Sequence, residues 1–249
     1  MKNIDVLNAL EKWCPSDSAA SYDNVGFLVG DRENEVTKIL VALDCTSAVI
    51  EEAKNIGANL IVTHHPIIWA PLKNVIEQTR VFKLIKNGIS VISCHTNLDV
   101  AKGGVNDCLA EKLELENLQI LDNAEGDFCS RYGELKEELT AKEFAKFIKE
   151  KLGTVVRFNK AKNSVKKVAI CGGAGSEMLV PALLSGCDAL VTADVKHSTF
   201  ITAEEKGISV FDAGHFHTEN MIVKPLAKFL KTQTNLPVFE SAIEPVEVL

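Results

Sequence analysis

The residues of this chain best suited to chemistry are histidines and carboxylates that follow short apolar segments. His64 and His65 come directly after the apolar run 60–63, and His95 follows the run 91–93. Imidazole and carboxylate side chains are ligands for zinc, manganese and iron in proteins. Two such ions held together can lower the pKa of a shared water and stabilise an oxyanion. The pattern therefore predicts a metal centre that activates water.

Two further acidic residues have the spacing of neighbours on one helical face. His95 precedes Asp99 by four residues, and His215 precedes Glu219 by four residues. Side chains four apart lie on the same side of a helix, and a carboxylate can bridge two ions. A metal site that includes His64, His65, Asp99, His215 and Glu219 is therefore expected. His95 is either a ligand, a residue that orients a ligand, or an acid/base group.

A lone histidine at the end of a strand is more often a hydrogen-bonded residue than a metal ligand. His197 and His217 are interpreted in this way. Asp194 follows the apolar run 189–192 and either joins the site or caps the next helix. The glycine cluster Cys171–Ser176 lies between an expected strand and helix. Its N–H groups either cradle a phosphate or form a tight turn, and the motif matches no standard phosphate-binding pattern.

The elements that position these residues occur twice. Residues 38–65 align without a gap with residues 167–194, at a constant offset of 129. Each copy consists of an apolar run, a turn, a helical pattern with a following glycine, and a second apolar run. Gly-Ile-Ser-Val then recurs in both copies, and the later offset of 120 places His95 on His215 and Asp99 on Glu219.

Strand–helix–strand units joined by short turns are typical of α/β folds with largely parallel sheets. Ligands of such sheets collect beyond the carboxyl ends of the strands. We expect two similar α/β halves, residues 1–122 and 123–249, whose last segment packs back on the first half. Within residues 123–166 we expect a polar stretch, a helix that begins after Thr140 with Glu143 at the capping-box spacing, and a strand.

Composition excludes several classes of protein. The chain has 249 residues, of which 46% are hydrophobic, and a formal net charge of -7. It is long enough to bury a large core, and an acidic chain with no long basic stripe is a poor general ligand for nucleic acids. No apolar run reaches the length of a membrane span. The seven scattered cysteines and the absence of a secretory signal indicate a reducing, cytoplasmic compartment.

The motifs resemble one family along essentially the whole chain. YDNVGFLVG, THHP, HTNLD, CGGAGS, TADVKH and DAGHFHTE occur in the order found in the NIF-three-like dinuclear-metal proteins, often labelled GTP cyclohydrolase I type 2 homologs. The resemblance implies two intertwined α/β halves with mixed sheets and a toroidal homohexamer. It also implies that His64, His65, Asp99, His215 and Glu219 hold two divalent ions (zinc, iron or manganese), with His95 near them.

The favoured function is a metal-dependent hydrolase that acts on a nucleotide or a related phosphorylated small molecule, with opening of the GTP purine ring as one such reaction. His95 is the expected catalytic proton shuttle. The alternative is a non-catalytic metal-binding or regulatory scaffold that forms a ring. A third interpretation is an α/β protein whose histidines only make local hydrogen bonds.

Overall fold

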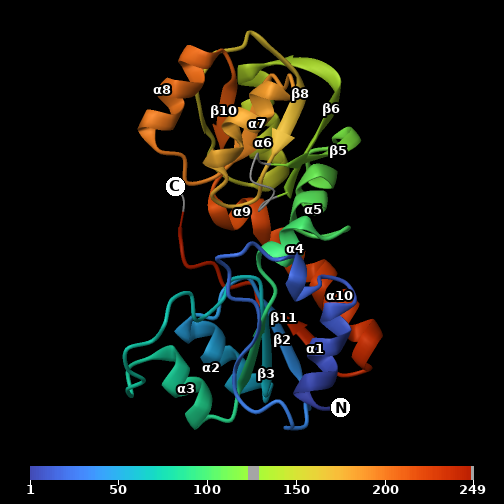
Figure 1. The fold of residues 1–249 in the computed structure, drawn as a ribbon, viewed down its shortest axis with the longest axis vertical. Coiled ribbons are helices and arrows are strands. Elements are labelled where there is room, and N and C mark those ends of the chain that lie inside the picture. Colours follow the sequence, from blue (N-terminus) through green and yellow to red (C-terminus); the bar gives the residue numbers. More distant parts are fainter. Residues whose placement is uncertain (123–128, 248–249) are drawn as a thin grey trace. The chain divides into compact units, whose positions relative to one another are not determined.

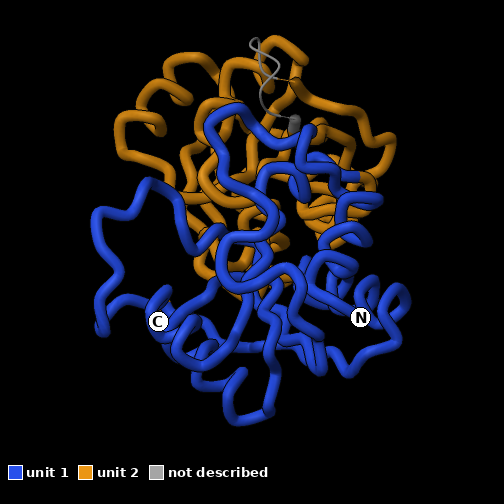
Figure 2. Tube along the Cα trace, turned by 60° about the horizontal axis from the view of Figure 1, so that its bottom comes forward, with its two compact units in different colours: residues 1–101, 222–245 blue, residues 102–221, 246–249 orange. Residues whose placement is uncertain are grey.

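The structure is a computed structural model that describes residues 1–122 and 129–247. The chain folds into two compact units, coloured separately in Figure 2. Unit 1 contains residues 1–101 and 222–245, and unit 2 is built on residues 102–221. The chain therefore leaves the first unit and later returns to it. The division into halves 1–122 and 123–249 refers to the sequence repeat and stays a prediction.

Unit 1 is built on a five-stranded sheet in the order β1-β4-β3-β2-β11. Strands β4, β3, β2 and β11 are parallel, and β1 is antiparallel to β4. The parallel strands end at one edge of the sheet, which is where ligands bind in open α/β sheets. The strands are β1 (Gly26–Val29), β2 (Ile39–Ala42), β3 (Leu60–Thr63), β4 (Ser90–Ser93) and β11 (Val238–Glu240).

Helices cover both faces of this sheet. In Figure 1, α2 and α3 lie on one side of β2 and β3, and α1 and α10 lie on the other. Strands β2, β3 and β4 are buried along their whole length, as continuous apolar runs predict for strands covered on both faces. The helices are α1 (Asn3–Glu11), α2 (Ser47–Ile56), α3 (Arg80–Lys86), α4 (Thr96–Val100) and α10 (Val223–Thr234), with 3-10 turns η1 (Ser16–Ser18) and η3 (Asn220–Ile222).

Unit 2 is built on a six-stranded sheet in the order β5-β6-β8-β9-β10-β7. The central strands β8, β9 and β10 are parallel, and the outer pairings are antiparallel. The mixed α/β class predicted from the sequence is therefore confirmed. The strands are β5 (Glu116–Asp122), β6 (Cys129–Thr140), β7 (Arg157–Phe158), β8 (Ser164–Ile170), β9 (Ala189–Thr192) and β10 (Ser209–Asp212).

Helix α6 of unit 2 begins where its sequence predicts. Thr140 Oγ1 accepts the N–H of Glu143 at 3.3 Å, and the Glu143 carboxylate accepts the N–H of Thr140 at 2.9 Å. This is the expected capping box. The helices are α5 (Val105–Lys112), α6 (Ala141–Leu152), α7 (Leu179–Leu184), α8 (His197–Lys206) and α9 (His215–Glu219), with a 3-10 turn η2 (Ser176–Met178).

The repeat appears as two matching segments, β2–α2–β3 in unit 1 and β8–α7–β9 in unit 2. The matched glycines Gly57 and Gly186 both follow the helix with a φ of 70°. That left-handed conformation favours glycine, which ends a helix there at little cost. The polar stretch expected before α6 is in part the long strand β6, while residues 123–128 of that stretch lie outside the described residues.

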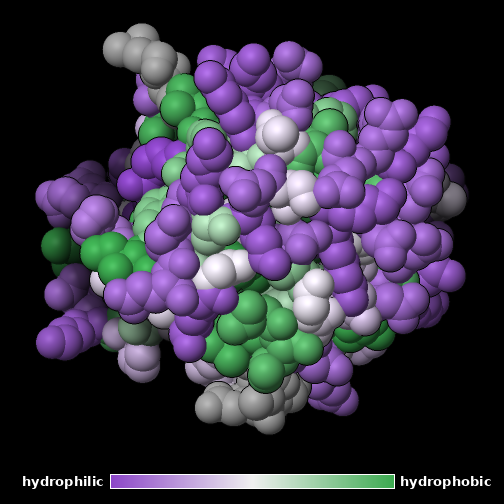
Figure 3. All heavy atoms as spheres, turned by 90° about the horizontal axis from the view of Figure 1, so that it is seen from above, coloured by the Kyte–Doolittle hydropathy of each residue, from purple (hydrophilic) through white to green (hydrophobic). Residues whose placement is uncertain are grey.

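The surface drawn in Figure 3 is mostly hydrophilic, with apolar side chains gathered in separate patches. Within residues 1–122 and 129–247, every helix is too short or too polar to cross a lipid bilayer. Six cysteines in this part of the chain are free thiols, and five of them are buried, as predicted for small apolar residues.

Candidate metal centre

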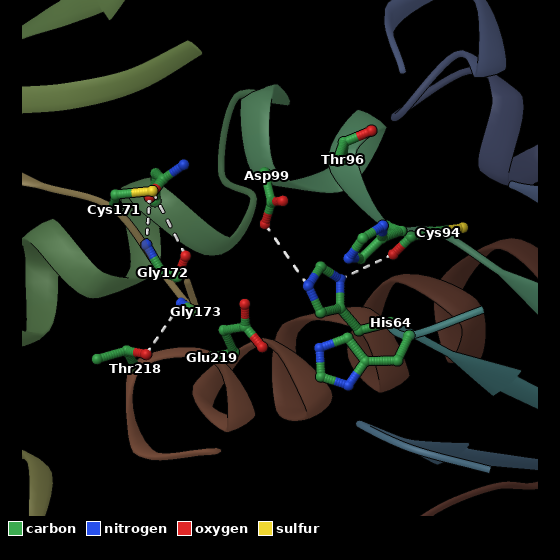
Figure 4. Close-up of polar contacts among 12 residues, drawn as sticks. His64, Cys94, Thr96, Asp99, Cys171, Gly172, Gly173, Thr218 and Glu219 are labelled. Atoms are coloured by element: carbon green, nitrogen blue, oxygen red, sulfur yellow. Dashed lines mark hydrogen bonds and ion pairs between the residues drawn. The ribbon is translucent and has the colours of Figure 1, made fainter. Parts of the chain in front are cut away.

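The first predicted ligand, His64, directly follows β3 and is buried. Its Nδ1 lies 2.9 Å from the carbonyl oxygen of Cys94, as Figure 4 shows. A carbonyl only accepts hydrogen bonds, so Nδ1 carries the proton and Nε2 keeps its lone pair. Nε2 lies 3.6 Å from Oδ1 of Asp99, which is also buried. The tautomer with its proton on Nδ1 can bind a metal ion through Nε2.

His65 is oriented by a carboxylate from the neighbouring strand end. Its Nδ1 lies 2.8 Å from Oδ1 of Asp44, which follows β2 as His65 follows β3. An ionised carboxylate accepts the Nδ1 proton and leaves Nε2 as the ring's lone-pair donor. Carboxylate–histidine pairs of this kind fix the ring and raise its basicity in metal sites.

Three imidazoles of unit 1 gather at the carboxyl ends of β3 and β4. Ring centroids of His64 and His65 are 5.0 Å apart, and those of His64 and His95 are 5.1 Å apart. One ring nitrogen from each of the three lies within 4.8 Å of the others, so the group could hold a metal ion. The structure thus brings His64, His65, His95 and Asp99 of unit 1 to one place.

His95 is held by a buried carboxylate that the sequence did not single out. Its Nδ1 lies 3.0 Å from both oxygens of Asp23, which also accepts the N–H of Thr96 at 3.0 Å. Burial raises the pKa of Asp23, but hydrogen bonds from His95 and Thr96 outweigh it and hold this pKa well below its usual 3.8. Asp23 is therefore a stable anion beside His95.

Unit 2 positions the other predicted ligands on the short helix α9. Nε2 of His215 lies 3.1 Å from Oε2 of Glu219, which is buried. Nδ1 of His215 lies 2.6 Å from Oδ2 of Asp194, so that this histidine also presents Nε2. Of the two alternatives for Asp194, its contact with His215 favours a place at the site, because the next helix, α8, begins only at His197.

The glycine loop packs against Glu219. A Cβ added at Gly173 would lie 3.0 Å from Cδ of Glu219 and 3.0 Å from Nε2 of His215. The N–H of Gly173 donates to Thr218 Oγ1 at 3.0 Å, a bond drawn in Figure 4. The N–H of Gly172 donates to Asn106 Oδ1, also at 3.0 Å. These N–H groups are already bonded within the unit, so the structure favours the tight turn over the phosphate cradle.

The remaining two histidines are His197 and His217. His197 is exposed at the first position of α8, and the ring of His217 lies 5.8 Å from that of Phe216. Sequence reasoning missed the partners Asp23 and Asp44. Asp44 had the same signal as His64, a polar residue just past an apolar strand.

Comparison with known proteins agrees with this architecture. The family model described as Duf34/NIF3 (NGG1p interacting factor 3) matches residues 1–246. A Clostridium perfringens protein named GTP cyclohydrolase 1 type 2 homolog is 37% identical over 247 residues, covering 96% of this chain and 94% of its own length.

Solved structures of relatives have the same fold. Staphylococcus aureus protein SA1388 is similar with a TM-score of 0.91 at 30% identity, over 100% of this chain and 99% of that one. Reduced HcgD from Methanocaldococcus jannaschii has a TM-score of 0.86 at 31% identity, over 98% of both chains. The chain therefore belongs to the Duf34/NIF3 family.

Proposed function

We propose that this protein is a dinuclear metal-dependent hydrolase that acts on a nucleotide or a related phosphorylated small molecule. The observation that carries the proposal is the shared tautomer of His64, His65 and His215. Each ring has its Nδ1 held by an oxygen acceptor and presents Nε2. Metal-ligating histidines usually have one ring nitrogen bonded to an oxygen acceptor, so that the other nitrogen can bind the ion. Three nearby histidines that share this arrangement are expected of metal ligands.

The proposed ligands are His64, His65 and Asp99 in unit 1 and His215 and Glu219 in unit 2, which would together hold two divalent ions, as the family resemblance implies. Imidazole nitrogen and carboxylate oxygen are a suitable donor set for zinc, iron or manganese. Such ions lower the pKa of a water ligand to about 7 and polarise the oxygen of a bound substrate.

His95 is the proposed proton carrier. Asp23 fixes its Nδ1, so that proton exchange takes place at Nε2. The anionic Asp23 also stabilises the imidazolium form that exists after His95 has taken a proton. The free thiols of the described residues suit the proposed cytoplasmic location. Assembly as a homohexamer is proposed from family resemblance, and light scattering should give six times the mass of one chain.

The direct test combines metal analysis with turnover. Purified protein loaded with zinc, manganese or iron is expected to hold two ions per chain and to hydrolyse at least one member of a nucleotide panel that includes GTP. Glu219→Gln should reduce both metal content and turnover. Glu205→Gln, at an exposed position of α8, is the matched control and should change neither.

Two outcomes would contradict the proposal. Equal turnover by the wild type and Glu219→Gln would place the activity elsewhere. Stoichiometric metal with no turnover of any candidate would favour the alternative, a metal-binding scaffold.

A further inference from the structure

Two large aromatic side chains of unit 1 are exposed next to His95. Tyr22 is 61% exposed and Trp69 is 55% exposed, with ring centroids 6.2 Å apart and planes at 60°. The ring of Trp69 lies 5.5 Å from that of His95, nearly perpendicular to it. The three rings therefore form one continuous group that begins at the imidazole cluster and ends in solvent.

The segments that carry these rings are tied together and to the site. Nδ2 of Asn24 donates to the carbonyl oxygen of Ile68 at 2.6 Å, so that the residues next to both rings are joined. Asp23, between Tyr22 and Asn24, is bonded to His95 and Thr96. The segments that carry the two rings are thus tied to each other and to His95 by hydrogen bonds of the neighbouring residues.

Exposed aromatic surface of this size is unfavourable in water, at about 25 cal/mol per Å² of apolar area. Trp13 is the chain's other tryptophan, and its ring packs against that of Phe229, with centroids 4.8 Å apart. Trp69 instead is 55% exposed, and its ring lies beside that of His95. An exposed aromatic ring beside a reactive group is well suited to stack on a planar ligand.

We propose that Trp69 and Tyr22 form an aromatic platform for the substrate, in which its planar heteroaromatic ring stacks on Trp69 and meets Tyr22, inclined at 60° to Trp69, at its edge. This inference rests on the proposed function, because it places the ring of a nucleotide-like molecule beside His95. Stacking recognises the flat faces of the ring and tolerates variation at its edge. The platform therefore selects for a heteroaromatic base and leaves the phosphate to other groups.

The test compares a ligand that has a heteroaromatic ring with one that lacks it. Calorimetry on the metal-loaded full chain measures the Kd of guanosine 5′-monophosphate and of ribose 5-phosphate. Trp69→Ala is expected to weaken binding of the nucleotide by about 5- to 150-fold, the range for loss of one base–aromatic stack. Binding of ribose 5-phosphate should stay the same.

Matched variants separate stacking from damage to the fold. Trp69→Phe keeps a flat ring and should restore most of the affinity, and Tyr22→Ala should weaken nucleotide binding in the same direction. Trp13→Phe changes the tryptophan that lies away from the platform and should have no effect on the Kd. Metal content and the urea midpoint of each variant show whether it is folded and loaded.

Nucleotide binding tests the platform, and turnover tests the proposed hydrolase, so the two can fail separately. Unchanged nucleotide affinity in Trp69→Ala and Tyr22→Ala, with normal metal content, would overturn the platform. So would a wild type that binds neither guanosine nor adenosine monophosphate. If Trp69→Ala splits an oligomer and leaves the Kd unchanged, the rings belong to a protein interface and the platform is wrong. Trp69-dependent nucleotide binding without turnover would keep the platform and overturn the hydrolase.

Discussion

The carboxylate of Asp44 lies 2.8 Å from Nδ1 of His65, at the ends of two adjacent parallel strands. In unit 2 the carboxylate of Asp194 holds Nδ1 of His215 in the same way. The repeat aligns Asp194 with His65, so the second copy carries the orienting carboxylate where the first carries the histidine.

Loss of either orienting carboxylate should weaken metal binding. Asp44→Ala frees Nδ1 of His65, so that the ring can rotate or take the other tautomer, and metal affinity should fall about 10- to 100-fold. Asp44→Asn keeps an oxygen acceptor and should lie between the wild type and Asp44→Ala. Competition with a chromogenic chelator measures the affinities.

Asp194→Asn repeats this test in unit 2, and Asp17→Asn, in the exposed turn η1, is the neutral control. Equal affinity of Asp44→Ala and the wild type would show that the Asp44–His65 pair does not support a metal ligand.

Gly173→Ala should displace Glu219. The added Cβ would overlap the end of the Glu219 side chain, which is flexible enough to move away. Metal content should therefore fall much more than stability. Gly186→Ala has the same type of backbone strain, with a φ of +70° against +60°, and no atom within 4 Å of its added Cβ.

The Gly186→Ala control should cost about 1 kcal/mol of unfolding free energy from left-handed strain alone, with metal content unchanged. Urea unfolding and elemental analysis on both variants separate the two effects. Similar metal content in the two variants would rule out the close packing of Gly173 on Glu219.

Asp23 should make stability depend on pH in the acidic range. Its pKa is lower in the folded chain than its usual 3.8, so it stabilises the fold above about pH 4 and loses that contribution as the pH falls further. Asp23→Asn should lower the unfolding free energy by roughly 1.5–3 kcal/mol at pH 7, the range for hydrogen bonds to a charged group.

The difference between wild type and Asp23→Asn should then shrink between pH 4 and pH 2.5 in urea titrations. A difference that stays constant over this interval would mean that the Asp23 carboxylate is not the group that titrates.

The described thiols should react slowly with alkylating reagents. Burial raises the pKa of Cys45 to about 12 and that of Cys108 and Cys187 to about 11. At pH 8 a thiol of pKa 11 is only ~0.1% ionised, against roughly a quarter for one of pKa 8.5. Peptide mapping after iodoacetamide should show little modification before unfolding in urea. Cys108 is the most informative of these thiols, because it is only half-buried and the reagent can reach it. Its rapid alkylation would contradict the raised pKa.

The strands and the histidine pairs could be predicted because they depend on local sequence. Continuous apolar runs gave β2, β3 and β9 within a residue or two, and four-residue spacing put His215 and Glu219 on one helix. Strand β6 was missed since it is largely polar and has no regular alternation, with Ser130 and Arg131 both buried and residues 136–138 all exposed. Asp44 and Asp23 bond to residues 21 and 72 positions away, and no periodicity contains that information. Exposure of Trp69 likewise depends on the whole fold.

The glycine at position 173 has a further consequence for how the two copies have diverged. Gly173 aligns with Asp44 in the repeat, and Glu219 aligns with Asp99. The first copy therefore combines an aspartate in the turn with the shorter Asp99, and the second combines a glycine in the turn with the longer Glu219. In the second copy a side chain at position 173 would meet Glu219, so a return to aspartate there would displace this carboxylate unless the longer side chain were shortened as well. The two copies of the duplication therefore place their carboxylates by different local packing.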